Sequence, residues 1–181
     1  MNSTVLVRYG AIPEVSRFRT ELPEGAERGA AVVIESSRGL ELGTLLEAVP
    51  PVAENGSSGR QNGSKGHDTD LRLIRVAEAA DIESHEAIRR ECNSEFETWR
   101  SRITGWKLQL ELIDLERTLD RSKLILYVLN ERGPDCTKLA LFSAAAGLGI
   151  VEVQPVTAEG LVRLETGGGG CGSGGGGCGC G

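Results

Sequence analysis

A polar stretch in the first half of the sequence sets the strongest limit on how this chain can fold. Residues 53–68 read AENGSSGRQNGSKGHD and contain no large apolar side chain. A segment of this kind cannot offset the entropy of ordering its backbone by burying apolar surface. The sequence therefore predicts two folded parts joined by a flexible loop or tether. The first folded part is predicted over residues 1–50 and the linker over 51–69. The second folded part is predicted over 70–156, followed by a tail over 157–181.

The first part is predicted to be built from β-strands. Strand-like runs rich in branched and apolar residues end at turn residues such as Ser37-Arg38-Gly39. The predicted strands are 5–9, 15–20, 30–35 and 40–46. They are enough for a small β meander or a barrel-like unit.

The second part is predicted to alternate strands and helices in the order β-α-β-β-α-β. Ile88, Cys92, Phe96, Trp99 and Ile103 recur at spacings of one helical face, which indicates a long helix. The full set of predicted elements is strand 71–76, helix 81–102, strand 107–115, strand 123–129, helix 134–146 and strand 150–154, ended by Pro155. The fold class is therefore α+β, with helices on one face of a mixed sheet.

Composition limits the functions that this chain can have. Its 181 residues carry a net charge of −6 and only 4% aromatic residues, which argues against a general nucleic-acid surface. No apolar run approaches the roughly 20 residues that span a bilayer, and the start lacks a secretory pattern, so a cytoplasmic protein is predicted. A phosphate loop is absent, and neither histidine belongs to a serine or cysteine signature. We therefore expect no enzymatic activity unless the fold reveals a polar pocket.

The glycine-rich tail carries the best candidates for chemistry. From Gly167 the sequence is glycine except for one serine and the thiols Cys171, Cys178 and Cys180. Thiolates bind zinc, copper(I) or iron–sulfur clusters, and the fourth ligand would be Cys136, Cys92, His67 or a cysteine of another chain. The alternative is a disordered Gly/Cys tail whose thiols have no ligand. Cys92 is expected in the core, and Cys136 is expected to be structural or, at a helix start, reactive.

Two hairpin motifs resemble a known family. Residues 35–44 (ESSRGLELGT) are similar to the E-T-x-R-G-L-E-x-G hairpin of the polymerase-suppressor (PSP-type) C-terminal domain family. Residues 112–127, with DRSKL inside them, are similar to its Y-T-F-D-G-S-K-L-x-F-Y hairpin. Residues 71–77 resemble the strand before its long helix. The resemblance covers roughly residues 4–156 and supports the mixed fold.

Membership of this family implies a cytoplasmic regulator that acts through protein partners. The resemblance also implies a role in mRNA maturation by an endoribonuclease and in developmental signalling. It further implies a partner complex that is associated with iron–sulfur clusters. Arg38 is expected to be exposed at the tip of the first hairpin, and Arg121 and Lys123 flank the turn of the second. The three would form a partner or nucleic-acid contact if the hairpin tips lie together; otherwise they are ordinary turn residues. Direct RNA or DNA binding, and metal sensing by the tail, remain the alternative functions.

Overall fold

In the computed structural model, residues 3–21, 26–49, 71–130 and 133–162 are described. The predicted linker 51–69 and the three tail cysteines lie outside these residues, so the predictions made for them stay predictions.

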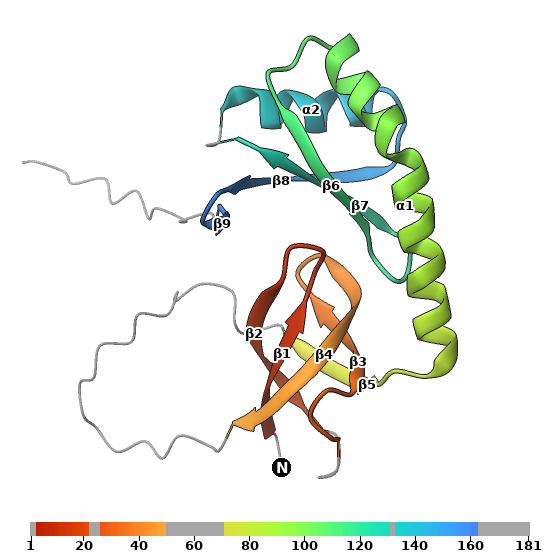
Figure 1. Cartoon of the computed structure of the whole chain (residues 1–181), viewed down its shortest axis with the longest axis vertical. Coiled ribbons are helices and arrows are strands. Elements are labelled where there is room, and N and C mark those ends of the chain that lie inside the picture. Colours follow the sequence, from red (N-terminus) through yellow and green to blue (C-terminus); the bar gives the residue numbers. More distant parts are fainter. Residues whose placement is uncertain (1–2, 22–25, 50–70, 131–132, 163–181) are drawn as a thin grey trace, which may run out of the picture.

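The first folded unit is a closed five-stranded barrel in the strand order β1-β2-β5-β3-β4 (Figure 1). Its strands are β1 (Ser3–Tyr9), β2 (Glu14–Thr20), β3 (Ala31–Ser36), β4 (Gly39–Val49) and β5 (Arg72–Val76). Alternate residues point inward because side chains alternate along a strand. The inward set forms the barrel core: Val5, Val7, Tyr9, Phe18, Val32, Ile34, Leu45, Leu71 and Leu73. The predicted barrel-like unit is confirmed.

Strand β5 belongs to the barrel, whereas the sequence placed it at the start of the second part. It pairs with β2 in parallel and with β3 in antiparallel register. Without it, β2 and β3 would each leave an unpaired edge, and Leu71 and Leu73 would lack the core that they fill. The boundary predicted at residue 70 is therefore wrong for this strand, although the β-α-β-β-α-β order along the chain is as expected.

The second unit is a four-stranded sheet covered by two helices, which confirms the mixed α+β class. Its elements are α1 (Ala79–Gly105), β6 (Glu111–Arg117), β7 (Lys123–Leu129), α2 (Pro134–Ala145), β8 (Ile150–Thr157) and β9 (Gly160–Leu161). Strand β7 pairs with β6 antiparallel and with β8 parallel, in the sheet order β6-β7-β8-β9. Strand β8 continues through Pro155 because proline is tolerated where no neighbour needs its missing N–H. The second unit therefore extends past the predicted boundary at residue 156.

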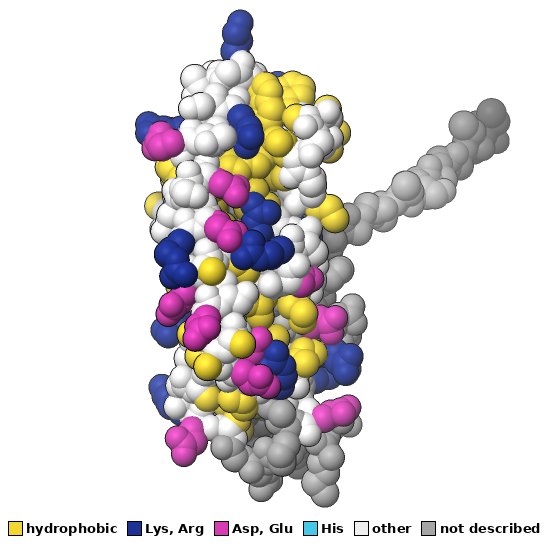
Figure 2. All heavy atoms as spheres, turned by 90° about the vertical axis from the view of Figure 1, so that its right-hand side faces the viewer, with side chains coloured by type: hydrophobic (Ala, Val, Ile, Leu, Met, Phe, Trp, Pro, Cys, Tyr) yellow, Lys and Arg dark blue, Asp and Glu magenta, His cyan; other side chains and the backbone are white. Residues whose placement is uncertain are grey.

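Helix α1 runs alongside both units (Figure 1). Ile88, Cys92, Trp99 and Ile103 are buried on one face, as the spacing predicts. Figure 2 shows that charged side chains of both signs lie over the side of the molecule where α1 runs. The helix ends before Lys107, whose φ of 57° redirects the chain. The alternating leucines predicted a strand that starts at Lys107. Strand β6 begins at Glu111 instead.

The two faces of the second sheet have different neighbours. One face packs against α1 and α2 around a core that includes Leu115, Leu126 and Leu139. The opposite face presents Ile125, Tyr127 and Val156 to Ala11 and Ile12 of the turn between β1 and β2. The barrel is therefore docked against the sheet through an apolar contact. Among the described residues, no helix combines the length and the apolar character needed to cross a membrane.

Candidate functional site

The two hairpin turns singled out in the sequence meet at the junction between the barrel and the second sheet. The N–H of Leu119 donates to the carbonyl oxygen of Leu40 at 2.7 Å. Gly39 has a φ of 134°, and a Cβ there would lie 3.3 Å from Thr118 Cγ2. Glycine is therefore needed at this turn both for its backbone conformation and for the close approach of the second hairpin.

Arg38 is buried at this junction, whereas the sequence predicted an exposed residue at a hairpin tip. Its side chain is 9% exposed. The guanidinium donates to both carboxylate oxygens of Glu41, at 3.1 Å from Nε and 2.6 Å from Nη2. The hydroxyl of Ser36 also donates to Glu41 and accepts from the Arg38 backbone N–H. Arg38 turns inward because these partners replace the water that it loses.

Tyr127 and Glu116 extend this network into the second sheet. Arg38 Nη1 donates to the Tyr127 hydroxyl at 2.7 Å, and that hydroxyl donates to Glu116. Glu116 also accepts the backbone N–H of Ala11 at 3.0 Å and lies 3.7 Å from Arg38 Nη1. We call Ser36, Arg38, Glu41, Glu116 and Tyr127 the junction network. It joins β3 and β4 of the barrel to β6 and β7 of the sheet.

The surroundings of Arg38 and Tyr127 raise the pKa of both side chains, so both keep their protons. Burial lowers the pKa of Arg38, but the negative charge of Glu41 opposes this and holds the pKa above its ordinary value. Burial raises the pKa of Tyr127, and the charge of Glu116 raises it further. Arg38 therefore stays charged and Tyr127 keeps the proton that it donates to Glu116.

Arg121 and Lys123 lie near Arg38, as the sequence suggested, but each has its own acidic partner. Arg121 donates to Glu91 of α1 at 2.5 and 3.0 Å, and both side chains are about half exposed. Lys123 Nζ lies 2.9 Å from Glu152 and 3.5 Å from the carbonyl oxygen of Ser37. All three predicted contact residues are thus paired with carboxylates. Their role in binding a partner or a nucleic acid stays a prediction.

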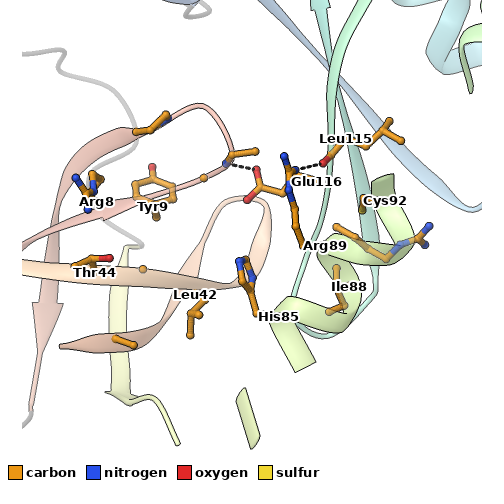
Figure 3. Close-up of a pocket in the computed structure, with 16 residues that line it drawn as sticks. Arg8, Tyr9, Leu42, Thr44, His85, Ile88, Arg89, Cys92, Leu115 and Glu116 are labelled. Atoms are coloured by element: carbon orange, nitrogen blue, oxygen red, sulfur yellow. Dashed lines mark hydrogen bonds between the residues drawn. The ribbon is translucent and has the colours of Figure 1, made fainter. Parts of the chain in front are cut away.

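A pocket opens beside the junction network, between the barrel, α1 and β6 (Figure 3). His85 and Cys92 of α1 both line it. The Cys92 side chain is 1% exposed, and burial raises the pKa of its thiol. Burial therefore favours the protonated thiol of Cys92, which is a poorer nucleophile than a thiolate.

The cysteines among the described residues are part of the hydrophobic core. Cys92 and Cys136 are both buried, neither forms a disulfide, and they pack in the cluster between the helices and the sheet. This confirms the expectation for Cys92. Within the described parts of the chain, no group of three or more His, Cys, Asp and Glu side chains is arranged to hold a metal ion.

Sequence reasoning missed four residues of the junction network: Ser36, Glu41, Glu116 and Tyr127. Glu41 lies three residues after Arg38 in the first motif, and Tyr127 ends the second motif within an apolar run. A phenol in such a run needs a buried hydrogen-bond partner, which was the available signal. Nothing in the sequence indicated that the partner would come from the other unit.

Comparison with known families covers the second of the two hairpins and the strand before α1. Residues 71–140 match the family described as the PSP1 C-terminal conserved region. This match begins at Leu71 and does not include the Arg38 hairpin. Stage 0 sporulation protein YaaT of Bacillus subtilis (strain 168) is 27% identical over 149 residues, which cover 81% of this chain and 50% of YaaT.

The chain spans about half the length of this curated relative. No solved structure matches this chain significantly. The two findings agree: residues 71–140 are similar to the PSP1 C-terminal conserved region, and the chain is similar to YaaT over most of its length.

Proposed function

We propose that this chain is a non-enzymatic regulatory adaptor of the cytoplasm that acts by binding partner proteins. Its similarity to a stage 0 sporulation protein supports a role in developmental signalling. We also propose a role in mRNA maturation, within a complex that includes an endoribonuclease, because the resemblance of the hairpin motifs implies it. The paired charges of the junction network support binding rather than catalysis, because no free acid, base or nucleophile is left among them.

An exposed apolar surface is the observation that carries this proposal. Residues 139–151 contain no charged side chain. Leu141 and Phe142 of α2 are 62% and 40% exposed, and Ile150 at the start of β8 is 65% exposed. Figure 2 shows hydrophobic side chains gathered at its upper end, the end of the molecule at which Figure 1 places α2. We call Leu141, Phe142 and Ile150 the α2 surface, and its occupant is a partner protein with an apolar, uncharged contact face.

The test is recovery of partner proteins with tagged full-length chain from its own host, followed by reconstitution with the purified partner. Leu141→Lys should abolish binding, because it places a charge at the centre of the contact. Ile82→Lys on α1 is the matched control, since Ile82 is an exposed helical residue far from α2 in the sequence. Binding that survives Leu141→Lys would contradict this surface.

The proposed role in mRNA maturation has a separate test. Transcript ends would be mapped in the host with and without the chain, and in a strain carrying Leu141→Lys. We expect unprocessed transcripts to accumulate in the deletion strain and in the Leu141→Lys strain. Identical transcript ends in all strains would contradict the role in mRNA maturation while leaving protein binding intact.

We propose RNA contact as a second function, supported by the outer face of the barrel. Arg19 and Arg72 are opposite each other on the parallel strands β2 and β5, and Arg17 precedes them on the same face of β2. None of the three has an ion pair among the described residues. Adjacent like charges are unfavourable unless an anion lies between them.

Fluorescence anisotropy with a single-stranded RNA tests this second function. Replacing Arg17, Arg19 and Arg72 by serine should weaken binding and flatten its dependence on salt. Replacing Arg90, Arg100 and Arg121 by serine removes the same charge from other surfaces and serves as the control. Equal weakening by both triple variants would show that only net charge matters.

A further inference from the structure

Strand β8 has a free edge over most of its length. On one side β7 pairs with it from Ile150 to Val156. On the other side β9 pairs only with Val156 and Thr157, and Figure 1 shows β9 at the far end of β8. Among the described residues, no strand pairs with the outer side of β8 over 150–154. An unpaired strand edge is a template on which another strand can pair.

A hydrogen bond at the end of β8 shows which of its backbone groups point outward. The carbonyl oxygen of Pro155 accepts the N–H of Val162, which directly follows β9, at 3.0 Å. Pro155 therefore faces the outer side, and successive residues of a strand turn their backbone groups to opposite sides. Val151 and Val153 thus turn their N–H and C=O groups to the free edge. Within the described parts of the chain, these groups have no hydrogen-bond partner.

The other open edge of the sheet, β6, is protected in a way that β8 is not. Arg89 of α1 donates to the carbonyl oxygen of Leu115 at 2.9 Å, and the carboxylate of Asp114 accepts the N–H of Leu115 at 2.8 Å. These side chains occupy backbone groups that an added strand would need. Residues 139–151, which lead into the free edge of β8, carry no charged side chain that could protect it. The β8 edge is therefore open to pairing where the β6 edge is closed.

The free stretch is complementary to a second copy of itself. In an antiparallel pair, residues that face outward on one strand must lie opposite residues that face outward on the other. The β9 strand of each copy occupies the outer side of β8 beyond residues 150–154, so only this stretch can pair. A pair centred on Glu152 uses the whole stretch, and it places Val151 of each copy opposite Val153 of the other.

The side chains agree with this register. Val151 and Val153 pack against the core on the helix side of the sheet, so they would form two β-branched pairs across the contact. Glu152 would lie opposite its own copy, where two like charges are unfavourable. Lys123 lies 2.9 Å from Glu152 in each copy and neutralises that charge. The register therefore leaves no uncompensated charge at the centre of the contact.

We propose that two copies of this chain form a dimer in which their β8 edges pair antiparallel, with the twofold axis at Glu152. The two four-stranded sheets then become one continuous sheet, and the outward backbone groups of Val151 and Val153 gain partners. Contact between two copies goes beyond the proposed binding of a partner protein. It does not require Leu141 or Phe142 of the α2 surface, so either proposal can fail without the other.

Sedimentation velocity of the full chain tests the dimer directly. Up to about 100 μM, which covers moderate affinities, we expect a concentration-dependent species of twice the mass of the chain. Val153→Pro removes an outward N–H and leaves the pairing with β7 intact, as Pro155 already does on the same side of β8. Because the dimer loses this hydrogen bond twice, its Kd should rise about tenfold or more. A chain that stays monomeric, or a dimer that Val153→Pro leaves unchanged, would overturn the proposal.

Cysteine cross-linking tests the register and does not depend on how well Val153→Pro folds. In a chain whose three tail cysteines are replaced by serine, Glu152→Cys should form a disulfide-linked dimer under mild oxidation. The two copies of position 152 would face each other with Cα atoms about 4.5 Å apart, within the range of a disulfide. Ile150→Cys is the matched control, because it is more exposed on the same strand, yet its two copies would lie roughly 13 Å apart. Equal cross-linking of the two variants, or none with Glu152→Cys, would contradict pairing about Glu152.

Discussion

At the scale of single residues, the junction network rests on an ion pair that is almost removed from water. Arg38 and Glu41 are 9% and 3% exposed, and they are joined by two hydrogen bonds. Taking two charges out of water costs several kcal/mol, and their mutual attraction offsets this cost only while both partners are present. The pair therefore specifies how the hairpin is placed more than it adds to stability.

Replacing one partner of this pair should cost more than replacing both. Arg38→Met leaves the Glu41 carboxylate buried without its cation, so the free energy of unfolding should fall by about 3–5 kcal/mol. The double variant Arg38→Met with Glu41→Leu should recover much of this loss. Urea unfolding of the two single variants and the double variant measures the coupling, and strictly additive effects would contradict a buried ion pair.

At the scale of elements, the start of α1 depends on one carboxylate. Asp81 accepts both Arg75 Nη groups, at 2.5 and 2.8 Å, and the backbone N–H of Glu78 at 2.8 Å. The Arg75 hydrogen bonds and then the Glu78 N–H lower the pKa of Asp81 to about 2. The helix N-terminus is thereby tied to β5 of the barrel.

The stability added by Asp81 should depend on pH. Its pKa in the folded protein is below the ordinary value of 3.8, so its contribution is present above pH 3.8 and is lost as the pH falls towards 2. Asp81→Asn should therefore lower the melting temperature at pH 6 and have little effect near pH 2. A constant difference between the two proteins across this range would show that the charge of Asp81 does not contribute.

Two glycines offer a matched test of packing in the barrel and in α1. A Cβ on Gly43 would lie 2.5 Å from Val7 Cγ1, whereas a Cβ on Gly105 would meet no atom within 4 Å. Gly43→Ala should destabilise the protein by about 1–3 kcal/mol, because β1 and β4 must move apart. Gly105→Ala should be neutral or slightly stabilising. Equal effects in thermal unfolding would contradict the close contact of β1 with β4.

The sequence predicted most elements, because each depends on a local pattern. The face formed by Ile88, Cys92, Trp99 and Ile103 fixed α1, and the apolar run from Leu124 to Val128 fixed β7. The pairing of β5 with β2 and β3 joins residues that lie on either side of the predicted linker 51–69, and no local pattern encodes such a contact. The inward turn of Arg38 escaped prediction for the same reason, since its partner Tyr127 lies 89 residues away.

At the scale of the whole molecule, the barrel and the second sheet share one interface. The apolar contact of Ile125 and Tyr127 with Ala11 and Ile12 lies beside the junction network. Helix α1 also connects the two units, since it begins after β5 and packs against β6 (Figure 1). These contacts predict that the two units unfold together rather than as independent domains.

Native-state hydrogen exchange tests this central claim most directly. We expect the core amides of β1 and β3 in the barrel to exchange with the same free energy as those of β7 in the second sheet, because both require global unfolding. Arg38→Met should separate them, with the barrel opening at lower free energy. If the barrel amides of the unaltered protein already exchange through a separate, much easier opening, the two units are not one cooperative body and the junction network does not join them.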